Sequence, residues 1–405
     1  MTNRLYYDNA YLTDFSGEVL ACEPDGEFFS VLLDRSAFYP TSGGQPYDTG
    51  MLDEARVLDV NVMDGQVWHK VSSPLPVGRQ VQGCIDWPRR FDHMQQHAAD
   101  HMIAGALHRF FGGVTIGLHI SDDISTIDVA MPEGKVHLSD ADIRRIEADV
   151  NDHIQRDVPI RCWFPNEEEL ASLPLRKQPT VNEHVRIVAI GDDEMVACGG
   201  THPASAGQIG LVKILWTAPA RGKMRVAFVA GRRALADYDQ CSHAAHQSAQ
   251  LLSSSIDALP EAVSAALERL KAAETELAKM KKERLLARIP SFLADAVSLP
   301  GGIRLVSRFV EADAQQLREL AAEMIRQTGV IALLGAQTDD QALYVFARAS
   351  DVQINMGALL QDAARPLGGK GGGRPDFAQG GGCIEILESA REKILTMMSK
   401  NITEQ

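Results

Sequence analysis

Residues 89–111 read RRFDHMQQHAADHMIAGALHRFF. Its apolar residues recur at positions 91, 94, 98, 102, 106 and 110, the spacing of one face of an α-helix. Gly112 and Gly113 follow directly, and glycine commonly ends a helix. The sequence therefore predicts an amphipathic helix over 89–111.

Three histidines, His93, His97 and His101, are spaced four residues apart along this helix. Side chains four apart lie on one helix face, so two adjacent imidazoles can share a metal ion. The spacing leaves two pairs open, His93 with His97 or His97 with His101. Ala98 follows His97, so the HExxH arrangement of zinc peptidases, with its general-base Glu, is absent.

A second motif, CGGTH, places Cys198 four residues before His202. The two glycines between them allow a tight turn that brings a thiolate and an imidazole together. A thiolate with imidazoles is a ligand set that zinc favours, in four-coordinate geometry. Either motif alone is more often chance, but both in one chain predict a zinc site, with a purely structural zinc as the main alternative.

Before the helix, residues 1–88 carry short apolar runs between turn signals. The runs are SVLLD, ARVLDVNVM and QVWHKV, and the turns contain PDG, SGG and MDG. This pattern predicts a β-rich, barrel-like N-terminal subdomain.

After the helix, residues up to 235 mix strands with one further helix. ISTIDVAM (124–131), PIRCWF and VRIVAI read as strands, and 213–231 reads as a hairpin with a basic turn. Ser139, with Asp142 three residues later, approximates a capping box that opens a helix over about 140–156. We therefore expect a zinc-binding α/β domain over 89–235.

The remaining chain divides at a change of composition. Residues 236–289 are rich in Ala, Leu, Glu and Lys, and we expect a helical hairpin that bends at Leu259–Pro260. Residues 290–405 alternate strands and helices, as in a compact α/β domain, and contain the Gly-rich tract GGKGGGRPDFAQGGG at 368–382. The predicted fold class of the whole chain is α+β.

Composition limits the class of protein. The 405 residues include no apolar run long enough to span a membrane and no basic head followed by an apolar stretch, so we expect a cytoplasmic protein. The six cysteines lie far apart, which argues against a disulfide framework. The net charge of −14 argues against a nucleic-acid partner, although basic clusters occur, among them the run from Arg221 to Arg233.

Three motifs resemble those of alanyl-tRNA synthetase editing domains and of the free-standing alanyl-tRNA editing proteins. They are LLDRSAFYPTSGGQPYDTG (32–50), HMQQHAADHMI (93–103) and VRIVAIGDDEMVACGGTHPASAGQIG (185–210). The second is similar to the family's HTxxHLL helix and the third to its Cys-Gly-Gly-Thr-His loop. Ser36, Ser42 and Ala98 depart from the family's Thr, Gly and Thr.

The resemblance selects among the histidines. It implies that one zinc ion per chain is bound by His97, His101, Cys198 and His202, with His93 beside these ligands and not among them.

The C-terminal section resembles the DHH-associated domain at the end of alanyl-tRNA synthetases, and Arg374, Pro375 and Asp376 lie in the matching Gly-rich signature. With the helical hairpin before it, the chain is similar to the long form of the editing protein. The resemblance suggests that Lys370 and Arg374 contact tRNA phosphates or bases, with a flexible connection as the alternative. A homodimer through the hairpin or the C-terminal domain is left open.

The function that the resemblance implies is hydrolysis of seryl-tRNA(Ala), with glycyl-tRNA(Ala) as a second candidate. Gly43, Gly44 and Gln45 are then candidates to contact the terminal adenosine or the ester, and Ser36 is a candidate to sense the amino-acid side chain. Two alternatives remain, namely a non-catalytic tRNA-binding protein with a structural zinc and a related editing hydrolase for another mischarged tRNA.

Overall fold

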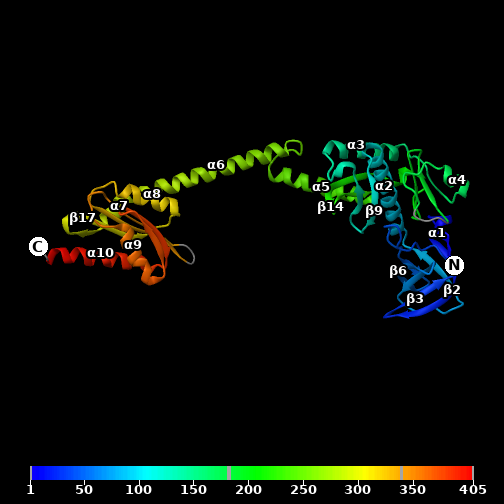
Figure 1. Cartoon of the computed structure of the whole chain (residues 1–405), viewed down its shortest axis with the longest axis horizontal. Helices are drawn as coiled ribbons and strands as arrows, with labels where there is room; N and C mark the ends of the chain where they lie inside the picture. The colour runs from blue at the N-terminus through cyan, green and yellow to red at the C-terminus, as the bar shows by residue number, and fades with distance from the viewer. Residues whose placement is uncertain (1, 180–183, 338–340, 404–405) are drawn as a thin grey trace. The chain divides into compact units, whose positions relative to one another are not determined.

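The computed structural model describes residues 2–179, 184–337 and 341–403. The chain forms two compact units, Met1–Ser248 and Ala249–Gln405, and each is described by itself. The elements are labelled in Figure 1.

A closed six-stranded barrel forms the N-terminal part of the first unit, in the strand order β2-β3-β7-β6-β5-β8. These strands are β2 (Asp14–Asp25), β3 (Phe28–Leu33), β5 (Gly50–Leu52), β6 (Ala55–Met63), β7 (Gln66–Val71) and β8 (Gln80–Ile85). Alternate residues of β7 and β8 are buried, as expected of strands with one face on a core. Beside the barrel, β1 (Asn3–Arg4) pairs in parallel with β4 (Arg35–Ser36), and helix α1 (Leu5–Asp8) follows β1.

Helix α2 (Trp87–Phe111) confirms the predicted helix and its glycine end. The Asp86 side chain accepts a hydrogen bond from Arg89 N, and Gly112 ends the helix in the left-handed conformation, with φ 66°. The prediction of an amphipathic helix is wrong, however, because every residue from His93 to Leu107 is buried. The reason is tertiary: neighbouring strands and loops contact α2 on all sides, so its polar residues face protein.

An antiparallel four-stranded sheet packs its inner face against α2 and α3. Its order is β14-β15-β10-β9, from β9 (Val114–Ile120), β10 (Ser125–Ala130), β14 (Val212–Ala220) and β15 (Lys223–Ala230). Helix α3 (Asp140–Gln155) begins with the predicted capping box of Ser139 and Asp142. Residues of both helices and of the sheet share one apolar core, which confirms the expected mixture of strands and helices here.

A smaller sheet positions the CGGTH loop, which follows its last strand. It pairs β11 (Ile160–Trp163), β12 (Ile187–Ile190) and β13 (Glu194–Ala197), all antiparallel, with helix α4 (Glu167–Ser172) between the first two strands. Short 3-10 turns lie at Pro132–Gly134 and Ala206–Ile209. The CGGTH loop begins directly after β13.

The helical stretch is divided near the predicted place. Helix α5 (Arg232–Leu251) ends before residue 252, and α6 (Leu259–Leu286) begins with Pro260 in its first turn, where proline is tolerated. The two helices lie largely in different units, so their packing as a hairpin stays a prediction.

The second unit is a six-stranded sheet with helices, in the order β16-β17-β18-β19-β21-β20. Its strands are β16 (Val297–Leu299), β17 (Ile303–Phe309), β18 (Val330–Gln337), β19 (Ala342–Arg348), β20 (Lys370–Gly373) and β21 (Phe377–Gly382). Its other helices are α7 (Ile289–Ala294), α8 (Ala314–Met324), α9 (Met356–Ala364) and α10 (Glu385–Thr403), with 3-10 turns at Pro300–Gly302 and Arg365–Leu367. Strands β17 and β18 are parallel and the other pairs are antiparallel.

Most of the Gly-rich tract forms a two-stranded hairpin, and not the flexible connection that was the alternative from the sequence. Strands β20 and β21 pair at one end of the sheet and pack against α9. A Cβ on Gly371 would lie 2.8 Å from Leu360 Cδ2, and one on Gly380 would lie 2.5 Å from the Lys370 carbonyl oxygen. Glycine is needed here because the hairpin and the helix approach too closely for side chains.

The α+β fold class is confirmed. The four-part division at residues 88, 235 and 289 stays a prediction. Among the described residues, no helix has the length and apolar character needed to cross a lipid bilayer.

A buried ion pair joins the start of α2 to the segment between β4 and β5. Arg90 Nε donates to Asp48 Oδ1 at 3.0 Å and Oδ2 at 2.9 Å, and neither side chain is exposed. Arg90 also donates to the Ala10 and Ala37 carbonyl oxygens. Asp48 in turn accepts from Tyr39 N at 2.6 Å, so both charges are fully hydrogen bonded.

We expect Asp48→Ala to lower the free energy of unfolding of the first unit by about 3–5 kcal/mol, because it leaves the Arg90 guanidinium buried without a counter-charge. All four tryptophans lie in residues 68–216, so tryptophan fluorescence during urea unfolding reports this unit alone. The control, Asp25→Ala, breaks the exposed pair with Lys70 and should cost about 1 kcal/mol or less. Equal effects of the two variants would contradict this assignment.

Candidate metal centre

Helix α2 presents His97 and His101 one turn apart. The two imidazole rings are stacked, with centroids 5.0 Å apart and planes within 11°. Both residues are buried, at 3% and 5% exposure. This is the pair that the resemblance selected.

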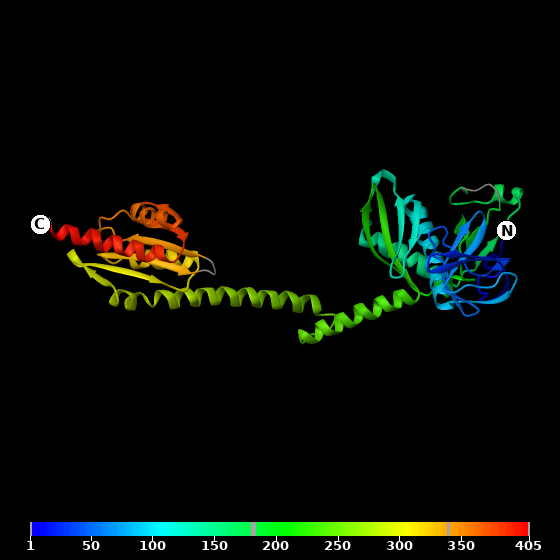
Figure 2. The ribbon, with the colours of Figure 1, turned by 90° about the horizontal axis from the view of Figure 1, so that it is seen from below.

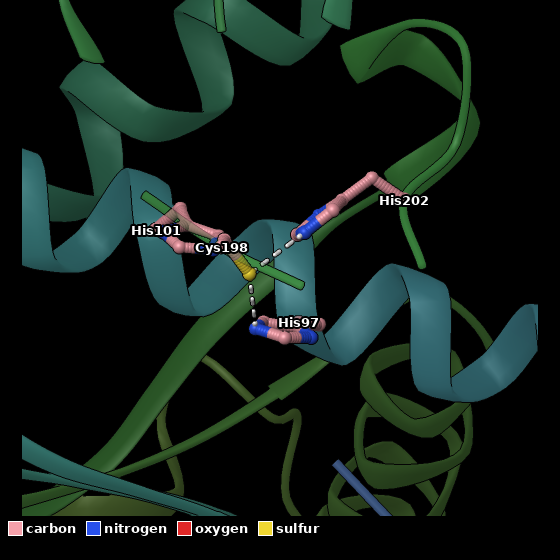
Figure 3. A group of neighbouring side chains, drawn as sticks. All are labelled: His97, His101, Cys198 and His202. Carbon is pink, nitrogen blue, oxygen red and sulfur yellow. Dashed lines mark hydrogen bonds between the residues drawn. The ribbon is translucent and has the colours of Figure 1, made fainter. Parts of the chain in front are cut away.

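The loop after β13 brings Cys198 and His202 to the same place (Figure 3). Cys198 Sγ lies 3.4 Å from His97 Nε2 and 3.4 Å from His202 Nε2. One ligand atom from each of the four residues lies within 4.8 Å of the others. The four side chains can therefore hold one metal ion.

His93 lies outside this cluster. It is 1% exposed on the preceding turn of α2, and its Nδ1 has no hydrogen-bond partner among the described residues. Burial, with the neighbouring charges of Arg89 and Arg233, lowers the pKa of His93 to about 3. The structure thus places His101, and not His93, in the cluster with His97, while the binding of a metal by this pair stays a prediction.

Burial keeps the three clustered imidazoles neutral, the form in which imidazole binds metals. Burial and then the charge of Arg186 lower the pKa of His97 to about 3. Burial also lowers the pKa values of His101 and His202 well below the usual value for histidine, and it raises the pKa of the Cys198 thiol to about 12. Without a metal the cluster is therefore uncharged.

Unpaired nitrogen atoms show that the cluster fits a metal. Among the described residues, His101 Nδ1 and Nε2 and His202 Nδ1 are buried without a hydrogen-bond partner. Unpaired buried polar atoms are costly, and a bound ion satisfies such atoms. One sulfur and three imidazoles are a donor set suited to zinc.

The Gln45 side chain contacts both His97 and the CGGTH loop. Its Oε1 lies 2.8 Å from His97 Nδ1 and accepts from Thr201 N at 3.1 Å, while its Nε2 donates to Thr201 Oγ1 at 2.8 Å. An amide oxygen facing Nδ1 selects the tautomer in which Nδ1 carries the proton, so Nε2 of His97 is free to bind a metal. Gln45 is fully buried, and the structure places it against a ligand.

Arg186 was not among the residues selected from the sequence. Its NH1 donates to the carbonyl oxygens of Cys198 at 3.1 Å and Gly200 at 2.8 Å, and so fixes the turn of the CGGTH loop. Gly200 N lies 3.3 Å from Cys198 Sγ. The only signal in the sequence was a charged residue at the start of the apolar run VRIVAI.

Gly43 and Gly44 form the turn that leads into Gln45. Both have positive φ, 58° and 87°, and Gly43 is exposed with open space beside its Cα. A Cβ on Gly44 would lie 2.3 Å from the Leu118 carbonyl oxygen of β9, so only glycine fits there. This turn therefore lies between the sheet edge and the cluster.

Ser36 is fully buried in β4, in a hydrogen-bonded chain. Its Oγ lies 2.7 Å from His69 Nε2 and accepts from Phe38 N at 3.1 Å, while His69 Nδ1 lies 3.1 Å from the Val31 carbonyl oxygen. Burial lowers the pKa of His69 to about 4, so the ring is neutral and accepts the Ser36 proton. Sensing of an amino-acid side chain by Ser36 stays a prediction.

Lys370 and Arg374 lie in the second unit. Lys370 begins the edge strand β20, and Arg374 Nε lies 3.4 Å from Asp376 Oδ1 in the following turn. Both side chains are exposed. Their contact with tRNA stays a prediction.

Three protein families match parts of the chain. Residues 11–89 match the class II (A) tRNA synthetases, residues 185–227 match the threonyl and alanyl tRNA synthetase second additional domain, and residues 302–402 match the DHHA1 domain. The predicted resemblance of both the N-terminal part and the C-terminal section is confirmed.

Similar proteins cover nearly the whole chain. An alanine–tRNA ligase of Haloquadratum walsbyi is 33% identical over 94% of this chain, and one of Pyrococcus furiosus is 32% identical over 97%. The chain spans about two-fifths of the length of these ligases, 42% and 43% respectively. The alanyl-tRNA editing protein AlaX-L of Pyrococcus horikoshii is 29% identical over 97% of this chain and 98% of its own length. A solved C-Ala domain of Aquifex aeolicus alanyl-tRNA synthetase covers 26% of the chain at 23% identity, with a TM-score of 0.24, too low to carry an argument.

Gly200→Ala should abolish or strongly weaken metal binding, because the added Cβ would lie 2.2 Å from His97 Cε1 and 2.3 Å from Nδ1. The adjacent Gly199→Ala is the matched control, since its Cβ would meet only Tyr7 Oη at 3.3 Å. We would measure the binding of cobalt(II) by its absorption spectrum, which reports thiolate coordination. Unchanged binding by Gly200→Ala would show that the cluster is not the metal site.

Proposed function

The chain is a relative of alanyl-tRNA editing proteins and of alanine–tRNA ligases, and on that premise we propose that it is a free-standing aminoacyl-tRNA deacylase. Its substrate would be tRNA(Ala) mischarged with serine, with glycine as a second candidate. The reaction would be hydrolysis of the ester between the amino acid and the terminal adenosine. The observation that carries the proposal is the convergence of His97, His101, Cys198 and His202 in one buried cluster.

We propose zinc as the metal, one ion per chain, because the donors are three neutral imidazoles and one cysteine, which would release its proton and bind as the thiolate. Such an ion supplies a Lewis acid and can lower the pKa of a bound water. The four side chains also match the closed coordination of structural zinc sites, which favours the second candidate function, a tRNA-binding protein with a structural zinc. For the ion to act in catalysis, one protein ligand would have to dissociate from it or a fifth ligand would have to bind.

The glycine turn suits the approach of a substrate. Gly43 is exposed, and neither glycine offers a side chain that would block the backbone from a ribose or an ester. Gln45 is proposed to act through His97, because both of its polar atoms are already engaged within the protein. The Ser36 hydroxyl is already hydrogen bonded to His69 and to Phe38 N. Ser36 is therefore proposed to affect the choice between amino-acid substrates indirectly, by holding the backbone around Phe38 in place.

The C-terminal unit is proposed to add a second contact on the same tRNA through Lys370 and Arg374. Both cations are exposed on the β20–β21 hairpin, where they can contact phosphates. A second contact of this kind raises affinity without any change in the first.

A homodimer is proposed on the apolar residues of α6. Leu267, Leu270 and Leu277 are 62%, 55% and 53% exposed, and their separations of three and seven residues fit one side of a heptad seam. We place the protein in the cytoplasm, where mischarged tRNA is found.

We expect purified protein to hydrolyse seryl-tRNA(Ala) at least about 100-fold faster than alanyl-tRNA(Ala), because a pocket that bonds the serine hydroxyl penalises an analogue without it. The measurement is release of the amino acid from labelled aminoacyl-tRNA, with a panel of other mischarged tRNAs to test the related-hydrolase alternative. Cys198→Ala should abolish the activity, while Cys84→Ala, at an exposed position of β8, should keep it. Seryl-tRNA that stays intact with zinc-loaded protein would rule out the deacylase.

Gln45→Ala should lower zinc affinity by about 10- to 100-fold, because it removes the acceptor that orients His97. Competition with a chromophoric chelator measures this affinity. Gln80→Ala, on the exposed side of the barrel strand β8, is the matched control and should bind zinc as the unchanged protein does. Equal affinities for all three proteins would contradict the role given to Gln45.

A further inference from the structure

The outer face of the four-stranded sheet in the first unit is not needed for the metal cluster. Ile127, Val129, Val226 and Phe228 point inward, into the core shared with α2 and α3. Their neighbours along each strand therefore point outward, because successive side chains of a strand alternate between faces. The strands β9, β10, β14 and β15 appear in Figure 2 as the cyan and green strands of the first unit.

One row of cross-strand partners crosses this outer face from edge to edge. Trp216 of β14 pairs with Ala227 of β15, Ala227 pairs with Thr126 of β10, and Thr126 pairs with His119 of β9. Trp216 is 44% exposed, and His119 is exposed at the other end. Ala227, in the middle of the row, is buried and Thr126 is half-buried, so the exposed side chains of the row are Trp216 and His119 at its two ends. Three strand spacings of roughly 4.8 Å give the row a length of about 14 Å.

The His119 end of the row lies at the glycine turn. Ile120 N donates to the Gly44 carbonyl oxygen at 3.1 Å, so the turn lies along the open edge of β9. The next residue, Gln45, contacts His97 of the cluster. The outer face of the sheet is thus continuous with the approach to the metal site.

Two cations lie at the tip of the same hairpin as Trp216. Lys223 pairs with Ala220, four residues along β14 from Trp216, and Arg221 lies in the turn. Neither forms a salt bridge among the described residues, although the pKa of Asp128 is lowered by its hydrogen bond with Arg225 and also by the charges of Lys223 and Arg221. Arg225, next to them on the outer face, is held by Asp128 at 2.7 Å and 2.9 Å. In a chain with a net charge of −14, two cations on the same hairpin as an exposed indole suit an anionic ligand with stacking rings.

The geometry points to this face as a binding surface for single-stranded RNA, with bases on Trp216 and phosphates at Arg221 and Lys223. Aromatic platforms next to backbone-tracking cations are the means by which proteins hold single strands without reading their sequence. The surface would guide the unpaired 3′ end of a tRNA along the row to the glycine turn. The identity of the RNA as tRNA rests on the proposed function, whereas the surface itself does not.

The test is binding of uncharged tRNA(Ala) and of a single-stranded RNA oligonucleotide, which needs no hydrolysis. Trp216→Ala should weaken binding on the order of tenfold, because it removes one base-stacking platform. Trp216→Phe keeps an aromatic face and should restore most of the affinity. A folded Trp216→Ala variant that binds as tightly as the unchanged protein would overturn the proposal.

The charges are tested by the double variant Arg221→Glu with Lys223→Glu. Loss of two phosphate contacts should make the dependence of log affinity on log salt less steep by about 1.4. Arg144→Glu is the matched control, because Arg144 is exposed on α3, the helix that covers the opposite face of the sheet. Equal salt dependence in the double variant, in Arg144→Glu and in the unchanged protein would also overturn the proposal.

The test of the RNA-binding surface can fail or succeed independently of the test of deacylase activity. RNA binding that depends on Trp216 without hydrolysis of seryl-tRNA would count against the deacylase and support the surface. Hydrolysis of seryl-tRNA with an unchanged KM in the Trp216→Ala variant would do the reverse.

Discussion

Gln45 is a buried amide on which three distant segments of the first unit meet. Its oxygen faces Nδ1 of His97 on α2 and accepts the Thr201 N–H, while its nitrogen donates to the Thr201 hydroxyl. An unpaired buried amide is costly, so these contacts form only when the glycine turn, the helix and the CGGTH loop are all in place. The same contacts set the tautomer of His97 and leave its Nε2 facing Cys198 and His202.

The parts of this arrangement that have local signals could be predicted from the sequence. The helix over 89–111, its glycine end and the capping box at Ser139 each depend on residues within a few positions of one another. The HxxxH and CxxxH spacings likewise place each ligand pair on one helix turn or one tight turn. Local spacing did not indicate whether His93 or His101 pairs with His97. The resemblance to the editing family indicated His101, and the structure places His101 in the cluster.

The remaining parts depend on contacts between residues far apart in the chain. Gln45 and Thr201 are 156 positions apart, and nothing near Gln45 indicates its partner. The burial of α2 on all sides follows from what packs around it, so its own periodicity suggested an amphipathic helix instead. Arg186 resembles an ordinary strand residue until its contacts with the Cys198 and Gly200 carbonyl groups are known. The Gly-rich tract similarly gave no sign that α9 would pack against it and keep it ordered.

We propose that one thiolate and three imidazoles share a single zinc ion at the point where these segments meet. X-ray absorption spectroscopy of the zinc-loaded chain, with elemental analysis of the same sample, tests this ligand set. We expect one zinc per chain with one sulfur at about 2.3 Å and three nitrogens at about 2.0–2.1 Å. A first shell without sulfur, or no retained zinc in a folded sample, would contradict it.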